Sequence, residues 1–135
     1  MNFYVGTSGY SYKEWKGNFY PDDMSAKGML HYYGERFKTV EINNTFYRMP
    51  SVSVLETWAG DVPADFKFVL KASRQITHMK RLKDAADSVS YLLEAAGALK
   101  ERLGALLFQL PPKRRDLSSS TLGRALAILQ EMFAP

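Results

Sequence analysis

The chain has 135 residues, of which 46% are hydrophobic and 24% are charged, a composition that excludes a disordered chain and fits one globular domain. It contains no cysteine, which excludes disulfides and thiolate metal sites. The net charge is only +4, no apolar run approaches the roughly 20 residues of a membrane span, and no signal peptide is visible, so we expect a cytoplasmic protein without a membrane partner.

Short apolar runs alternate with helical patterns along the chain. Runs rich in β-branched, aromatic or leucine residues predict four strands, at 3–5, 39–43, 66–70 and 105–110. Apolar residues at helical spacing or helix-start signals predict four helices, at 26–37, from Ser53 onward, at 85–103 and around 122–133. This alternation implies right-handed crossovers and a parallel sheet, either an open doubly wound sheet or a barrel.

Two of the predicted helices carry further signals. Ser53 and Glu56 match a capping box, in which both side chains bind free amides at a helix start. The helix at 85–103 has one continuous apolar stripe, formed by Ala85, Val89, Leu92, Ala96, Leu99 and Leu103. Gly104 is then expected to end that helix in a left-handed conformation. The strand at 105–110 is apolar almost throughout, which is typical of a strand covered on both faces.

A glycine-rich segment, residues 6–9, follows the first predicted strand. Its backbone amides either cradle a phosphate or form a tight turn that needs the freedom of glycine. Aromatic side chains follow, and they either stack on a sugar or base or pack the loop over the end of the sheet. They are Tyr10, Tyr12, Trp15, Phe19 and Tyr20.

Four motifs occur in a fixed order between residues 3 and 112. They are Gly6–Tyr12 with Trp15 and Phe19–Pro21; Val40–Arg48; Phe68–Ser73 with Ile76–His78 and Arg81–Leu82; and Leu107–Pro112. On these motifs the chain resembles the YecE-like family, also called domain of unknown function 72, whose members are (β/α) barrels. The resemblance implies an α/β fold with a parallel, TIM-barrel-like arrangement of about four βα units. Tyr10 stands where tryptophan is more usual in the family.

Barrels of this family are about twice as long as this chain. The resemblance therefore implies that residues 1–135 are a single, truncated domain, the N-terminal half of a barrel that needs eight strands to close. Four strands leave two open sheet edges and expose side chains such as Val69 and Leu107 on one face. We therefore expect the chain to associate with itself through these open edges, or to be poorly soluble.

In parallel barrels, functional residues gather at the C-terminal ends of the strands, where the connecting loops converge. At these ends the predicted catalytic residues are Glu41, Lys71 and His78. The residues predicted to bind substrate are Thr7, Ser8, Asn43, Tyr47, Arg48, Ser73, Arg74 and Gln109. Because side chains alternate along a strand, we expect Glu41 and Lys71 to face the same side and to pair.

The expected pair of Glu41 and Lys71 has two interpretations. It is either a structural ion pair inside a barrel, or a general base or metal ligand beside a cation that binds an anionic substrate. His78 lies in a basic loop and is either a second acid–base group or ordinary polar surface. No metal site is predicted, because Glu41 and His78 are the only obvious ligands and most such sites need three. The sequence identifies no cofactor.

Three functions are compatible with these residues. The first is an enzyme that acts on a small or phosphate-bearing substrate at the strand ends. The second is a nucleic-acid binding or processing protein, whose basic segments 74–83 and 113–115 contact backbone phosphates. The third is a non-catalytic barrel fragment that needs a partner chain. Whether the chain is an enzyme stays open, because the family it resembles has no assigned activity.

Overall fold

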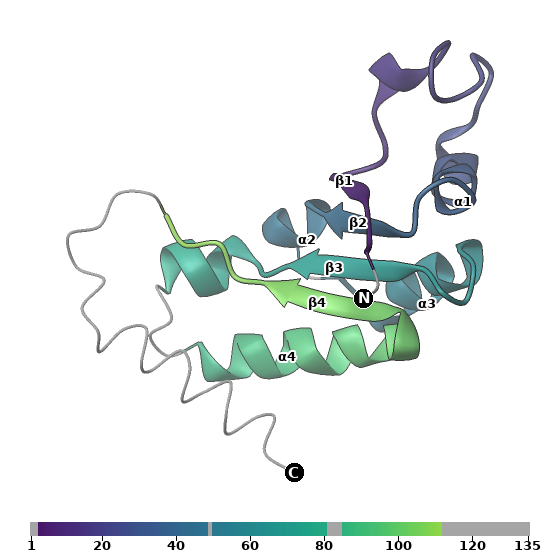
Figure 1. Ribbon diagram of the computed structural model, residues 1–135. Helices are drawn as coiled ribbons and strands as arrows, with labels where there is room; N and C mark the ends of the chain where they lie inside the picture. The colour runs from purple at the N-terminus through teal and green to yellow at the C-terminus, as the bar shows by residue number, and fades with distance from the viewer. Residues whose placement is uncertain (1–2, 49, 81–84, 112–135) are drawn as a thin grey trace.

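A parallel sheet forms the centre of the computed structural model, which describes residues 3–48, 50–80 and 85–111 (Figure 1). Its strands lie side by side in the order in which they occur along the chain, and each pair is parallel. They are β1 (Gly6–Ser8), β2 (Thr39–Ile42), β3 (Lys67–Lys71) and β4 (Leu103–Leu107). This arrangement confirms the predicted α/β class, because sequential parallel strands require helical crossovers.

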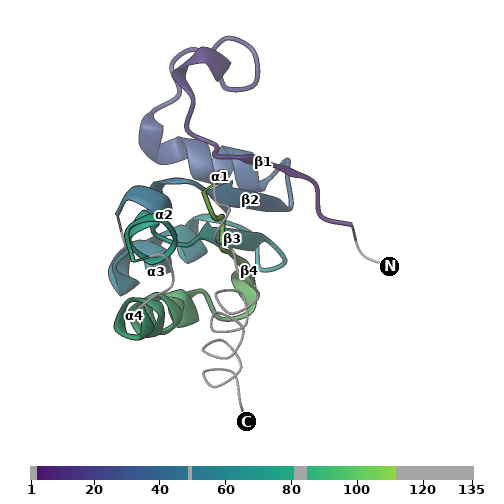
Figure 2. The same ribbon diagram turned by 90° about the vertical axis from the view of Figure 1, so that its left-hand side faces the viewer.

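Helices connect the strands, and Figure 2 shows α2, α3 and α4 on one side of the sheet. The α-helices are α1 (Met29–Gly34), α2 (Asn44–Tyr47), α3 (Val52–Asp61) and α4 (Ala86–Ala96). Segments of 3₁₀ or π helix span Lys13–Trp15, Ala26–Gly28, Gln75–Met79 and Gly97–Arg102. The first predicted helix is therefore a 3₁₀ turn followed by α1. The last one, around 122–133, lies outside the described residues.

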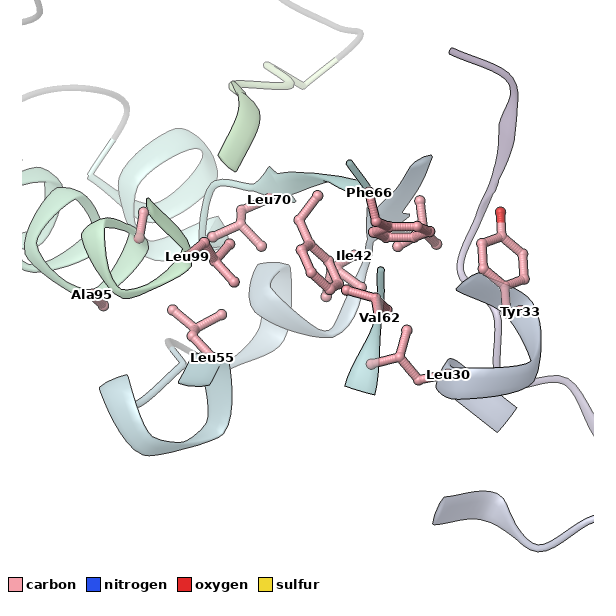
Figure 3. Close-up of a cluster of buried hydrophobic side chains, with 12 residues drawn as sticks. Leu30, Tyr33, Ile42, Leu55, Val62, Phe66, Leu70, Ala95 and Leu99 are labelled. Carbon is pink, nitrogen blue, oxygen red and sulfur yellow. The ribbon is translucent and has the colours of Figure 1, made fainter. Parts of the chain in front are cut away.

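The core lies between the sheet and these helices (Figure 3). Alternate strand residues point toward the helices and are buried, namely Val40, Ile42, Phe68 and Leu70. The helical side chains packed with them include Leu30, Tyr33, Leu55, Ala95 and Leu99. Burial of each valine, leucine, isoleucine or phenylalanine among them contributes roughly 1.5–3 kcal/mol. The residues between them, including Glu41 and Lys71, lie half-buried on the opposite face.

The first strand starts later than its sequence pattern predicts. Phe3, Tyr4 and Val5 are exposed, and β1 is instead Gly6–Ser8, the segment expected to be a turn. Gly6 allows this pairing because a Cβ there would lie only 1.8 Å from the carbonyl oxygen of Thr39 on β2. The position of β1 is therefore decided by the close approach of the two backbones, which only glycine permits. The apolar run at residues 3–5 does not decide it.

The start of α3 is also shifted from its prediction. Ser51, and not Ser53, is the N-cap, and its Oγ accepts a hydrogen bond from the Val54 amide at 3.4 Å. Ser53 lies inside the helix with its Oγ 3.1 Å from that of Ser51. The serine two positions earlier caps the helix because it is the residue with extended backbone dihedrals, as an N-cap requires.

The apolar stripe of α4 is buried as predicted up to Leu99, but the helix ends before Leu103, which begins β4. Lys100, with φ +49°, takes the left-handed conformation that was predicted for Gly104. Gly104 instead lies in β4, where a Cβ would come within 3.0 Å of Lys67 Cβ. Gly104 and Ala105 are exposed, so the prediction of a strand covered on both faces is wrong for this part of β4, which pairs with β3 on one side.

An exposed ion pair joins the turns that precede β2 and β3, where Lys38 Nζ lies 2.7 Å from Asp65 Oδ2. The hydrogen bond from Lys38 lowers the pKa of Asp65. The contact therefore stabilises the fold above the unfolded pKa of about 3.9 and loses this effect as the pH falls through the lower folded value. We expect Asp65→Asn to lower Tm at neutral pH, and the difference from wild type to shrink in acid melts. A difference that stays constant with pH would contradict this origin.

Candidate functional site at the strand ends

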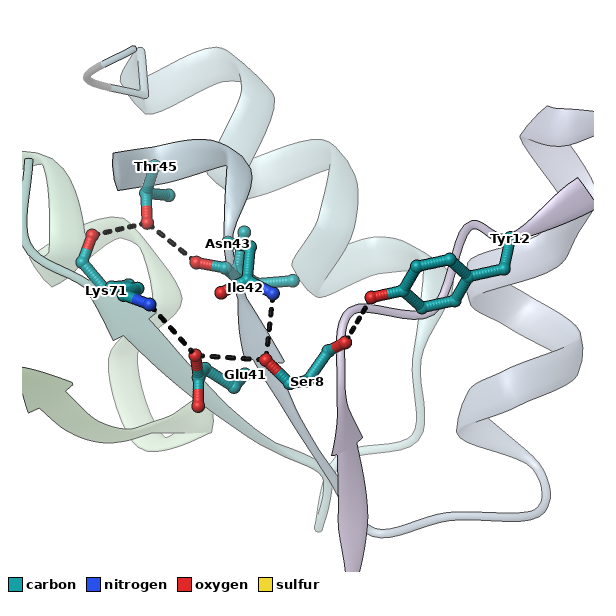
Figure 4. A network of polar contacts seen from close by, with 7 residues as sticks. All are labelled: Ser8, Tyr12, Glu41, Ile42, Asn43, Thr45 and Lys71. Atoms are coloured by element: carbon teal, nitrogen blue, oxygen red, sulfur yellow. Dashed lines mark hydrogen bonds and ion pairs between the residues drawn. The ribbon is translucent and has the colours of Figure 1, made fainter. Parts of the chain in front are cut away.

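Polar side chains from β1, β2 and β3 meet at the C-terminal end of the sheet, on the face away from the helices (Figure 4). Ser8 of β1 pairs in register with Glu41 of β2. Glu41 in turn pairs with Val69 of β3, two residues before Lys71. Alternation then puts Ser8, Glu41 and Lys71 on one face. Lys71 Nζ lies 3.8 Å from Glu41 Oε1, so the pair stands where the sequence places it.

Hydrogen bonds extend this ion pair toward β1. Ser8 Oγ donates to Glu41 Oε1 at 3.1 Å, and Asn43 Nδ2 donates to Ser8 Oγ at 2.8 Å. The side chains of Lys71 and Glu41 are 18% and 27% exposed, so water screens them less than surface ions but still reaches them. Among the described residues, the hydrogen bond and the ion pair of the Glu41 side chain are both made by Oε1 and none by Oε2. That oxygen is therefore open to accept a proton.

The ring of Phe46 contacts both Lys71 and His78. Lys71 Nζ lies 5.3 Å from the centroid of the Phe46 ring, a cation–π distance. The His78 ring meets the same phenyl ring edge to face at 5.1 Å, and its Nδ1 lies 2.8 Å from Thr77 Oγ1. His78 is thus near the site but does not contact Glu41 or Lys71. Its predicted catalytic role therefore requires a ligand that reaches both His78 and the ion pair.

Two residues outside the predicted set hold this site in place. The Thr45 hydroxyl is buried and lies 2.9 Å from the Ile42 carbonyl oxygen and 2.6 Å from that of Lys71, so it joins the ends of β2 and β3. The Tyr12 hydroxyl donates to the Ser8 carbonyl oxygen. A threonine directly after a strand is a usable sequence signal. Tyr12 belongs to the aromatic cluster that the sequence indicates, but its hydrogen bond to Ser8 could not be predicted because it depends on how the loop folds.

Thr7 points away from the site, toward the helices. Its amide donates to the Tyr33 hydroxyl at 2.8 Å, and its Oγ1 lies 3.0 Å from the same hydroxyl. Tyr33 in turn donates to the Thr39 carbonyl oxygen at 3.0 Å. Because side chains alternate along β1, Ser8 on the site face requires Thr7 on the opposite face. In this arrangement Thr7 fastens β1 to α1 and does not line the site.

Other predicted binding residues lie further out. Ser73 is buried, and its Oγ accepts a hydrogen bond from the Gln75 amide at 3.2 Å, which shapes the following turn. Arg74 is exposed, with its guanidinium carbon 5.8 Å from the centroid of the exposed Tyr47 ring. Gln109 is exposed beyond β4. The structure does not bring these residues into the network of Glu41 and Lys71.

The amides at Gly6–Gly9 do not form an open phosphate cradle. The Thr7 amide is bonded to Tyr33, and the Gly9 amide donates to the Glu41 carbonyl oxygen at 2.8 Å. Gly9 has φ +81°, the left-handed conformation that the tight-turn interpretation requires. Beside the turn lies a hollow of about 180 Å³, lined by residues 9–12 and 42–44. The strand ends therefore border a small cavity.

Packing accounts for most of the aromatic cluster. Phe19 contacts Trp15 at 5.7 Å and Tyr20 at 4.7 Å between ring centroids, and it also contacts Tyr33 of α1 at 6.1 Å. Tyr20 is buried, donates to the Tyr10 carbonyl oxygen, and burial raises the pKa of its phenol. These contacts favour the loop-packing interpretation over stacking on a ligand.

A family model matches residues 4–133, and its description is "Protein of unknown function DUF72". The chain belongs to the DUF72 family. This confirms the resemblance to YecE-like proteins that the sequence motifs carry. The description of the family names no activity, so the function of this DUF72 chain has to be argued from its site.

Individual relatives agree with this membership. The chain is 33% identical over 82 residues to the UPF0759 protein YecE of Escherichia coli K12, covering 61% of the chain and 30% of that protein. It is 26% identical over 115 residues to the UPF0759 protein YunF of Bacillus subtilis, covering 81% and 40%. The chain therefore spans well under half the length of these relatives.

Solved structures of DUF72 proteins share the fold. One from Thermotoga maritima superposes with a TM-score of 0.78 at 32% identity, over 98% of this chain and 52% of that one. One from Enterococcus faecalis gives a TM-score of 0.71 at 21% identity, over 95% and 46%, and shows the fold alone. These similarities agree with the TIM-barrel-like fold predicted from the sequence. That the chain is a truncated half stays a prediction.

Among the described residues of this DUF72 chain, no three His, Asp or Glu side chains lie close enough together to hold a metal ion. Among the same residues, His78 contacts Phe46 and Thr77, and no hydrogen bond or ion pair joins it to Glu41. In the same part of the chain, no helix has both the length and the apolar character needed to cross a bilayer.

Proposed function

We propose that the strand ends form an acid–base site for a small anionic or phosphate-bearing substrate. Lys71 binds the anionic group, and Glu41 takes a proton through its open oxygen Oε2. The observation that supports this best is the convergence of Ser8, Glu41, Asn43 and Lys71 at the C-terminal end of a parallel sheet. Of these four residues, Asn43 also lines the hollow next to the turn. Catalytic groups occupy this end in essentially all TIM-barrel enzymes.

The chemistry of the pair suits this role. Among the described residues, Lys71 Nζ has one ion-pair contact, at 3.8 Å to Glu41 Oε1, which leaves N–H groups that can donate to a phosphate or carboxylate oxygen. The ammonium also stabilises negative charge that develops on the substrate when Glu41 removes a proton. Ser8 Oγ donates to Glu41 Oε1 from the other side, and Asn43 Nδ2 donates to that Ser8 hydroxyl, so the network holds Oε1 and not Oε2.

Inorganic phosphate titrated by calorimetry at fixed ionic strength tests the anion site. We expect Lys71→Met to weaken phosphate binding about tenfold or more, because a charge-assisted hydrogen bond is lost. Glu41→Gln is expected to strengthen it, because a negative charge beside the anion is removed. Lys67→Met is the matched control, since Lys67 lies at the other end of β3 and donates to the Glu101 carbonyl oxygen.

The alternative, a purely structural ion pair, gives a different pattern. Both Lys71→Met and Glu41→Gln would then lower Tm, and neither would change phosphate binding relative to Lys67→Met. That result would overturn the proposed site. Arg81 and Lys83, on which the nucleic-acid hypothesis partly depends, lie outside the described residues, so that hypothesis stays a prediction. Steep salt dependence of oligonucleotide binding would support it.

A further inference from the structure

A second hollow, separate from the strand-end network, lies among helices α2, α3 and α4. Its volume is about 400 Å³, within the roughly 300–1,000 Å³ typical of small-molecule sites. Its walls are mainly apolar and come from three helices and the segment between α2 and α3. The side chains that give this groove its chemistry are Asn44, Arg48, Ser51, Val54, Trp58 and Tyr91.

The aromatic walls of this groove are held in fixed positions. The Trp58 ring stacks on buried Phe68 with centroids 6.4 Å apart and an interplanar angle of 25°. The Tyr91 hydroxyl donates to the Pro50 carbonyl oxygen at 3.2 Å, which ties α4 to the start of α3. Val54 and Tyr91 are still 41% and 46% exposed. Apolar surface that is both fixed and exposed is what a flat, apolar ligand needs.

Arg48 supplies the one cationic side chain that lines the groove within the described part of the chain. Among the same residues, its guanidinium has no carboxylate partner at ion-pair distance, unlike Arg36 with Glu35 or Lys38 with Asp65. A guanidinium matches the planar geometry of a carboxylate and binds it through two parallel hydrogen bonds. An unpaired arginine beside apolar aromatic walls therefore selects a ligand with an anionic group on an aromatic ring.

We propose that this groove binds a small aromatic carboxylate, with its ring against Trp58 and Tyr91 and its carboxylate on Arg48. The sequence predicts that Arg48 binds substrate at the strand ends, but in the structure this residue lines the helical groove and does not join the network of Glu41 and Lys71. The two sites are thus chemically distinct, one polar and one mainly apolar.

Calorimetric titration of the whole chain with 1-naphthoate tests the proposal, with neutral 1-naphthalenemethanol as the uncharged analogue. We expect saturable binding of the acid at one site, and about tenfold or more weaker binding of the alcohol. Arg48→Met should weaken binding of the acid by a similar factor and leave binding of the alcohol unchanged. Arg36→Met, an exposed arginine paired with Glu35, is the matched control and should bind both as wild type does.

A second variant and a competition experiment keep the proposal falsifiable. Val54→Trp should fill the groove and remove binding of both compounds while the circular dichroism spectrum stays native. Saturating inorganic phosphate, the probe of the strand-end site, should leave naphthoate bound. Equal affinities for acid and alcohol, an unchanged affinity in Arg48→Met, displacement by phosphate, or the lack of saturable binding would each overturn the proposal. Apart from displacement by phosphate, none of these outcomes bears on phosphate binding at Lys71.

Discussion

Phe68→Ala is expected to lower the free energy of unfolding by about 3–5 kcal/mol, as measured by urea denaturation followed by circular dichroism. Phe68 is fully buried at the middle of the sheet. Its ring stacks on Trp58 of α3 and meets Phe66 at 5.0 Å. Truncation to alanine removes these contacts and leaves a cavity between β3 and the helices, which the surrounding side chains fill only in part.

Val69→Ala is the matched control, because Val69 is the next residue of β3 and points to the opposite face, where it is half-buried. Its truncation is expected to cost less than about 1.5 kcal/mol, since it removes little packed surface. If both variants lost the same stability, the face that carries Glu41 and Lys71 would be as tightly packed as the helical face. It would then leave no room for a ligand at the strand ends.

Periodicity predicted the parts of the fold in which burial decides the structure. The stripe from Ala85 to Leu99 is buried as predicted, because a helix against a sheet must turn its apolar residues inward. Side chains alternate along β2 and β3, so Glu41 and Lys71 were predicted on one face for the same reason. The opposite face carries the buried residues of these strands, namely Val40, Ile42, Phe68 and Leu70. The ion pair at the candidate site could therefore be predicted from the sequence.

Element boundaries could not be predicted in this way. The α3 cap fell on Ser51 and not Ser53 because the choice between two nearby serines depends on backbone dihedrals. Gly104 was predicted to end α4, but Lys100 takes the left-handed conformation and Gly104 serves a close approach between β4 and β3. Glycine has both uses, and the sequence does not distinguish them.

The contacts around the candidate site could not be predicted from the sequence either. Lys71 and His78 share a predicted catalytic role, yet each contacts the ring of Phe46 and no hydrogen bond joins the two residues to each other. Thr7 and Ser8 are neighbours in sequence, yet only Ser8 reaches Glu41. The placement of Ser8 depends on where β1 begins, and an error of one strand position exchanges the two faces.

Gly6→Ala is expected to destabilise the chain by about 3 kcal/mol or more, at the upper end of the cost of overpacking. The added Cβ would lie 1.8 Å from the Thr39 carbonyl oxygen and 2.7 Å from its carbonyl carbon. These are backbone atoms, so no side-chain rotation relieves the clash and β1 has to move away from β2. The pairing of Ser8 with Glu41 would be lost with it, and urea denaturation measures the cost.

Gly60→Ala distinguishes this clash from a general effect of adding a methyl group. Gly60 lies in α3, where an added Cβ would meet none of the described heavy atoms within 4 Å. Alanine there is expected to raise stability by roughly 0.5–1 kcal/mol, because glycine is unfavourable within a helix. Opposite signs at the two glycines would show that β1 begins at Gly6 through contact with β2. If Gly6→Ala did not change stability, the result would instead support a first strand at Phe3–Val5, as the apolar pattern predicts. Ser8 would then lie outside the candidate site.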